Sequence, residues 1–174
     1  TQFLTAWGLR KMDGETAVTG TPKSWYRRKF GEPQIVLDRS VLNRYTFDAL
    51  NQNEISINTH SDDFQNALNH GGGYGEVYYK TASMLYNLQY LLGDSLFQGA
   101  IKHYFDQWKF AHPYFEDFKA SVTQYTHADL SWYFDQWFET TKPLDYGIGR
   151  IRKIHGADSF AIKLRRRGQM QMPV

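Results

Sequence analysis

Residues 71–92 read GGGYGEVYYKTASMLYNLQYLL, a glycine-rich stretch that runs directly into the most regular helical pattern of the chain. The glycines permit left-handed or close-approach backbone conformations that a residue with a Cβ resists. After them, apolar residues recur every three or four positions and predict one buried helix face: Val77, Thr81, Met84, Leu85, Leu88, Leu91 and Leu92. Tyr78 is then placed near the helix start. Taken alone, the segment favours a surface loop before a core helix over a functional site.

Helical patterns also flank this stretch. The chain opens on TQFLTAW, residues 1–7, and a second pattern covers residues 35–45. Residues 51–70 turn polar and predict a loop with a short extended piece around Ile55 and Ile57. After Gly93, Asp94 or Ser95 is predicted to cap a helix, Pro113 to start another, and a third to begin near Asp129. Short connections between consecutive helices predict antiparallel neighbours in a compact helical layer.

The period changes to two beyond Pro143, which ends the last helix. Residues 146–164 predict a strand, a turn and a strand, and Met170, Met172 and Val174 repeat the pattern at the end of the chain. Because a two-stranded ribbon is marginal alone, we place a domain boundary at residues 141–145. The expected fold is mainly α, with a helical unit over residues 1–141 and the beginning of a β domain over 142–174.

Composition excludes several function classes. The formal charge is +2, and the run of three arginines at residues 165–167 predicts a solvated strand end rather than a nucleic-acid partner. Residues 23–30, KSWYRRKF, predict a half-buried helix with exposed arginines. No apolar run is long enough to span a membrane, so we expect a soluble protein without a membrane partner. The lack of cysteine excludes disulfides but leaves the compartment open between cytoplasm and periplasm or secretion.

Few residues form a catalytic pattern. No serine lies in a G-x-S-x-G turn, and there is no cysteine nucleophile. No two of the six histidines stand three or four residues apart, so no helix presents a pair of metal ligands and no metal ligand is predicted in this chain. The glycine loop lacks both the kinase triplets and the Gly-Lys-Ser/Thr ending of a P-loop. The glycines are therefore interpreted as flexibility around Tyr78.

Several blocks resemble one enzyme family. Residues 77–82, VYYKTA, and 84–105, MLYNLQYLLGDSLFQGAIKHYF, resemble the thermolysin-like zinc aminopeptidases (gluzincins) of the aminopeptidase N and leukotriene A4 hydrolase type. In that family a tyrosine, any residue, a lysine and a glycine open a helix that continues into a leucine-rich run. Residues 116–118 and 129–137 are similar to two further family blocks, and TQFLTAW resembles the segment directly after the family's zinc-binding Glu-Gly-Phe. The resemblance covers most of residues 1–12 and 76–145.

The resemblance implies the helical C-terminal part of a thermolysin-like catalytic domain, followed by the first strands of a β-sandwich. It implies a parent enzyme that hydrolyses the N-terminal peptide bond of peptides with zinc-activated water. The HExxH and glutamate zinc ligands would lie upstream, so this chain alone is expected to be inactive and without zinc. Its catalytic residue would be Tyr78, which matches the family's oxyanion-stabilising tyrosine. Thr81 replaces the usual glycine, and Tyr79 is a weaker alternative to Tyr78. No substrate-binding residue is predicted.

Two other interpretations stay open. The chain could be a non-catalytic relative that serves as a helical protein-interaction scaffold, and the residues before Thr1 would distinguish this from an enzyme.

Both ends look cut, since the chain opens in a helix and closes within an expected strand, so the remainder of a parent polypeptide is an expected partner. An aromatic-rich helical repeat is disfavoured because the helices from Asp94 onward share no repeat length.

Overall fold

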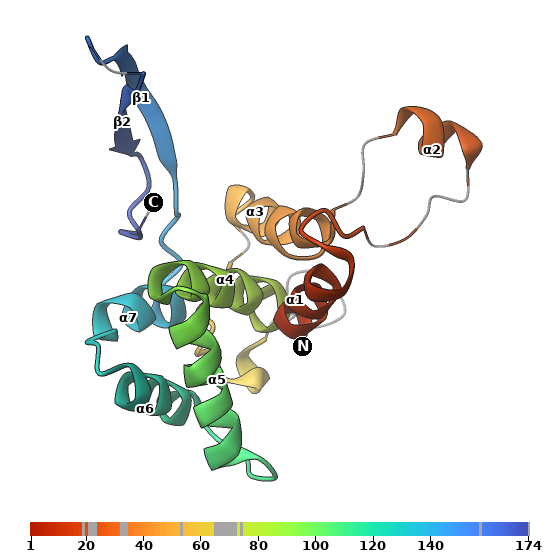
Figure 1. Ribbon diagram of the computed structural model, residues 1–174. Helices are drawn as coiled ribbons and strands as arrows, with labels where there is room; N and C mark the ends of the chain where they lie inside the picture. Colours follow the sequence, from red (N-terminus) through yellow and green to blue (C-terminus); the bar gives the residue numbers. More distant parts are fainter. Residues whose placement is uncertain are drawn as a thin grey trace.

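The computed structural model describes residues 1–18, 20, 24–31, 35–52, 54–64, 73, 75–156 and 158–173. It is mainly α-helical and ends in a two-stranded antiparallel sheet, which agrees with the fold class expected from sequence (Figure 1). The first half contains α1 (Gln2–Asp13), α2 (Trp25–Phe30), η1 (Asp38–Leu42), α3 (Asn43–Leu50), η2 (Ser61–Asp63) and η3 (Gly75–Lys80). The second half contains α4 (Thr81–Leu92), α5 (Asp94–Trp108), α6 (Phe115–Thr126), α7 (Ser131–Glu139), β1 (Tyr146–Lys153) and β2 (Phe160–Arg166).

Helix α4 lies in the middle of the helical body, with α1 and α5 packed against it (Figure 1). The predicted buried face is confirmed where α4 is regular, because Met84 and Leu88 are fully buried. The prediction is wrong for Val77, whose surface is 48% exposed. Val77 belongs to η3, a π-helix, whose wider turn does not keep the 3.6-residue period on which the prediction rests.

Helices α5 and α6 lie side by side and are joined by a short connection, as predicted. The predicted cap of α5 by Asp94 or Ser95 is wrong: Gly93, at φ 76°, precedes the helix, and no side chain caps it. Gln89 instead donates a hydrogen bond of 2.8 Å to the Asp94 carboxylate. The start of α6 carries a capping box, in which the Asp117 carboxylate accepts from the Tyr114 backbone N–H at 2.8 Å.

Helix α7 supplies the aromatic centre of the core. Its inner face carries four residues that are at most 6% exposed: Tyr133, Phe134, Trp137 and Phe138. Phe138 stacks on Phe115 of α6 with ring centroids 3.5 Å apart, and Trp137 packs against Tyr45 of α3. Aromatic rings bury large areas, so α7 joins the first and second halves of the helical body.

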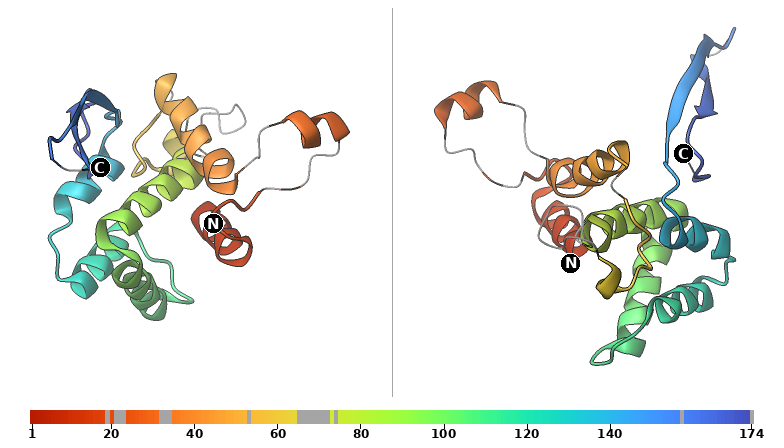
Figure 2. Two further views of the ribbon diagram at one scale, coloured as in Figure 1. Left: turned by 45° about the horizontal axis from the view of Figure 1, so that its top comes forward. Right: turned by 180° about the vertical axis from the view of Figure 1, so that it is seen from behind.

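Strands β1 and β2 form the predicted hairpin, which projects from the helical body (Figures 1 and 2). Ile148 pairs with Leu164 and Ile151 with Ile162, and a bulge between Ile148 and Arg150 keeps these residues on one face. That apolar face, completed by Phe160, is 44–62% exposed. The basic run at residues 165–167 lies at the end of β2 and is exposed, as predicted.

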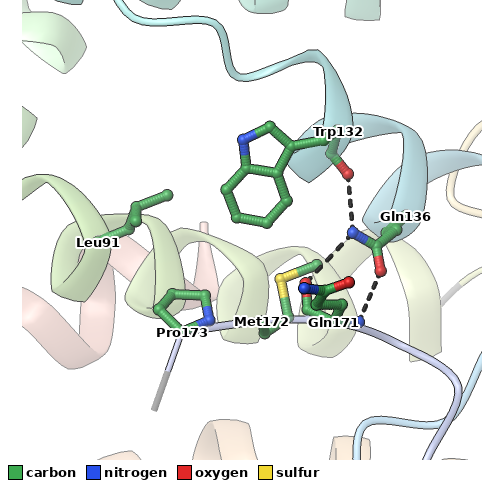
Figure 3. A pocket seen from close by; sticks show the side chains of 6 residues that line it. All are labelled: Leu91, Trp132, Gln136, Gln171, Met172 and Pro173. Atoms are coloured by element: carbon green, nitrogen blue, oxygen red, sulfur yellow. Dashed lines mark hydrogen bonds between the residues drawn. The ribbon is translucent and has the colours of Figure 1, made fainter.

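The strand predicted over residues 170–174 is not present in its described part, residues 170–173. The chain instead turns back onto the helical body and buries Met170 and Met172 in the core. Gln136 of α7 holds this tail by accepting from the Gln171 N–H at 2.6 Å and donating to its carbonyl at 3.2 Å (Figure 3). The period-two pattern therefore reflects two anchoring methionines.

Helix α2 stands away from the helical body (Figures 1 and 2). The prediction of a half-buried helix is wrong, because Trp25, Tyr26 and Phe30 are 60–65% exposed, and their rings contact one another. Within the described residues, no helix is long and apolar enough to cross a membrane.

Candidate active site

Tyr78 lies in the middle of η3, immediately before α4, and its side chain is half-buried. Short π-helical segments are rare and occur frequently at functional sites, because the extra residue in the turn redirects side chains. Tyr78 thus lies near the start of the continuous helical segment formed by η3 and α4, where the sequence predicts it. The π-helical geometry of η3 was not predicted.

Two glycines at or just before the start of η3, Gly73 and Gly75, allow close packing. Gly73 has φ 58°, and a Cβ at this position would overlap the ring of Phe64. A Cβ at Gly75 would lie 3.0 Å from a carboxylate oxygen of Asp48. For these two residues, close approach of neighbouring side chains explains glycine better than the flexibility predicted from sequence. Gly71 and Gly72 lie outside the described residues.

The ring of Tyr79 contacts a residue of α3. The guanidinium of Arg44 lies 5.8 Å from the centre of the Tyr79 ring, a cation–π arrangement. Arg44 also forms an ion pair of 3.3 Å with Asp48, whose side chain is buried and approaches Gly75. Arg44 thus holds the ring of Tyr79 against α3, and the first residue of η3 packs closely on Asp48.

Lys80, the last residue of η3, is a buried cation with only 2% of its side chain exposed. Its Nζ donates to the Thr140 carbonyl at 3.0 Å and to the Ile55 carbonyl at 3.3 Å. The Glu54 carboxylate, itself 5% exposed, lies 3.6 Å from Nζ. These groups supply both the countercharge and the acceptors that a buried ammonium requires. Thr140 comes directly after α7, so Lys80 also joins η3 to the end of that helix.

From the sequence, the spacing to Lys80 served only to favour Tyr78 over Tyr79 in the family motif. Glu54 was not predicted to be functional. Glu54 lies 26 positions before Lys80, in a connection whose pattern predicted only a loop with a short extended piece. No strand forms in its described part, residues 51–52 and 54–64. A lysine two residues after a candidate tyrosine, at the border of an apolar helix, was the one available signal.

Two other tyrosines near this region have structural roles. The Tyr133 hydroxyl donates to the Met84 carbonyl at 2.6 Å, and burial raises the pKa of Tyr133 well above its usual value. Burial, reinforced by the Glu54 carboxylate, also raises the pKa of Tyr45. Both phenols are therefore neutral at physiological pH, and both are packed against the core.

A metal site is not formed by the residues that the structure describes: no three His, Asp or Glu side chains among them are grouped to hold an ion. His60 and Asp62 approach to 3.5 Å but are exposed, and His70 lies outside the described ranges. The described residues therefore do not provide a zinc site.

A hollow of about 540 Å³ lies between α4, α7 and the returning tail (Figure 3). Its walls include Leu91, Trp132 and Pro173, and the polar groups of Gln136 are used in holding the tail. None of the lining residues was predicted to be functional. The hollow is best explained as a seam where the tail meets the helical body.

Comparison with known proteins identifies the family. Residues 22–137 match the model of the Peptidase family M1 domain. The match covers more than half of the chain, and the protein belongs to this peptidase family. It includes Tyr78, Lys80 and Glu54, whereas the opening block at residues 1–12 lies outside it. Searches of curated proteins and of solved structures gave no match.

Proposed function

We propose that this chain is part of a zinc-dependent aminopeptidase, in which Tyr78 donates a hydrogen bond to the oxygen of the peptide carbonyl under attack. That oxygen becomes negatively charged in the tetrahedral intermediate. A fixed phenol O–H placed beside it stabilises the transition state more than the substrate. A phenol suits this role because its O–H is a hydrogen-bond donor at the end of a rigid ring.

The observation that carries the proposal is the position of Tyr78 in η3, directly before two residues whose side chains are held in place. Tyr79 is covered by Arg44, and Lys80 is fixed by Glu54 and two carbonyls. Successive residues of a helical turn point in different directions, so the Tyr78 phenol does not share the direction of either neighbour. Its side chain is half-buried, and family membership supports a peptidase role.

The test is Tyr78→Phe in the full-length enzyme, with Tyr79→Phe as the matched control. We expect Tyr78→Phe to lower kcat by about a hundredfold or more, the usual effect of losing an oxyanion donor. Tyr79→Phe keeps the ring over which Arg44 lies and is expected to change kcat by less than about threefold. Hydrolysis of an aminoacyl amide under saturating conditions measures both. Near-normal turnover of Tyr78→Phe would remove Tyr78 from the mechanism.

We further propose that the zinc ligands belong to the remainder of the parent polypeptide, that a peptide is the substrate, and that this chain alone is inactive. The resemblance of residues 76–145 to the part of the family domain after the metal-binding motifs supports this. Metal analysis of the purified chain is expected to find well under one zinc per molecule. One equivalent of zinc per chain would contradict the proposal.

A further inference from the structure

Lys80 connects three segments that are distant in sequence. Its ammonium contacts Glu54 and Ile55, in the connection after α3, and Thr140, at the end of α7. The same two segments are also joined directly, since the Ser56 hydroxyl and the Asn58 N–H both donate to the Phe138 carbonyl. Lys80 therefore inserts the end of η3 into a junction that is already hydrogen-bonded.

The opposite end of η3 is held by a different set of contacts. Gly75 lies against the Asp48 carboxylate, which is paired with Arg44, and Arg44 covers the Tyr79 ring. η3 thus packs closely on α3 through Gly75 and the Tyr79 ring, and it is held at its last residue by the Lys80 junction. Rotation of the π-helical turn about its axis would break the Lys80 contacts or disturb this packing.

Burial restricts the movement of the Lys80 side chain. An ammonium taken out of water is strongly destabilised unless its partners stay in place, so the side chain cannot move away from Glu54 and the carbonyls without a large free-energy cost. An exposed ion pair gives no comparable constraint, because water replaces either partner at little cost. Lys102 and Asp106 on α5 form such a pair, with 75% of the Lys102 side chain exposed.

We propose that the buried Lys80–Glu54 pair is a positioning device that fixes the rotation of η3 and so directs the Tyr78 phenol at the substrate oxygen. This inference rests on the proposed function of Tyr78. Lys80 itself does not touch the substrate. Its effect is geometric: misplacing a catalytic group by about 1 Å lowers turnover by about a hundredfold.

The experiment is a double-mutant cycle in the full-length enzyme, with Lys80→Met and Tyr78→Phe made singly and together. We expect Lys80→Met to lower kcat by about 10- to 100-fold, because the Tyr78 phenol would no longer be held in position toward the substrate oxygen. We expect KM to change by less than about threefold, since Tyr78 acts on the transition state rather than on bound substrate. In the Tyr78→Phe background, Lys80→Met is expected to lower kcat by less than about threefold further, since residues that act as one unit are not additive.

Lys102→Met is the control for removal of a lysine from an ion pair and is expected to leave kcat unchanged. If Lys80→Met does not fold, as judged by circular dichroism, Glu54→Gln replaces it in the cycle, because the glutamine keeps the volume and an acceptor oxygen. A smaller decrease in kcat that disappears in the Tyr78→Phe background would support positioning.

The outcomes separate the two proposals. Near-normal turnover of Tyr78→Phe overturns the proposed function and the positioning role together. A slow Tyr78→Phe enzyme in which Lys80→Met lowers kcat by its full factor again leaves the proposed function intact and overturns the positioning role. Unchanged kcat in a folded Lys80→Met enzyme also overturns the positioning role.

Discussion

Helix α7 and the β1–β2 hairpin are consecutive in the chain and carry similar numbers of large apolar side chains, yet their environments are opposite. The inner face of α7 is at most 6% exposed, whereas the apolar face of the hairpin is 44–62% exposed. α7 packs between α3 and α6, while the hairpin projects away from the helices. Apolar side chains are thus buried only where another layer of helices or strands packs against them.

The largest effect that would test this difference is expected at Trp137. Trp137→Ala removes a fully buried ring that packs on Tyr45 and Tyr133, and it leaves a cavity in the core. We expect the free energy of unfolding to fall by about 3–5 kcal/mol, as for other buried aromatic truncations. Urea unfolding followed by far-ultraviolet circular dichroism measures it. A loss below about 1 kcal/mol would mean that α7 is not central to the core.

A much smaller effect is expected at Ile162 on the exposed face of the hairpin. Ile162→Ala removes a side chain that is already 56% exposed and is expected to change the free energy of unfolding of this chain by less than about 1 kcal/mol, as for most surface positions. The same urea experiment serves here. A loss as large as that of Trp137→Ala would show that this face is covered in solution, and the contrast between the two regions would disappear.

Much of the fold could be predicted from periodicity. The 3.6-residue pattern located α4 to α7, and the change to a period of two located the hairpin. Periodicity failed where the backbone departs from regular geometry or where anchoring mimics a pattern. Val77 is exposed because η3 is a π-helix, and Met170 and Met172 alternate because they dock into the core rather than extend a sheet.

The site was predicted less completely. The sequence indicated Tyr78 through its loop and its family resemblance, but it could not show how η3 is held. The anchors at Arg44, Asp48 and Glu54 lie 26 to 36 residues before Lys80, and only folding brings them to η3. Lys80 in particular reads as a surface cation, since lysine is almost never fully buried unless paired, and its partner is not visible in local spacing.

The claim that Tyr78 acts on the transition state is tested most directly by the affinity of a phosphinic peptide, in which a tetrahedral phosphorus group replaces the carbonyl under attack. In the zinc aminopeptidase that we propose, we expect Tyr78→Phe to weaken this inhibitor by about the same factor, near a hundredfold, by which kcat/KM falls. The affinity of a product amino acid should change by less than about threefold. Unchanged inhibitor affinity in Tyr78→Phe, beside unchanged turnover, would contradict a role of Tyr78 in the transition state.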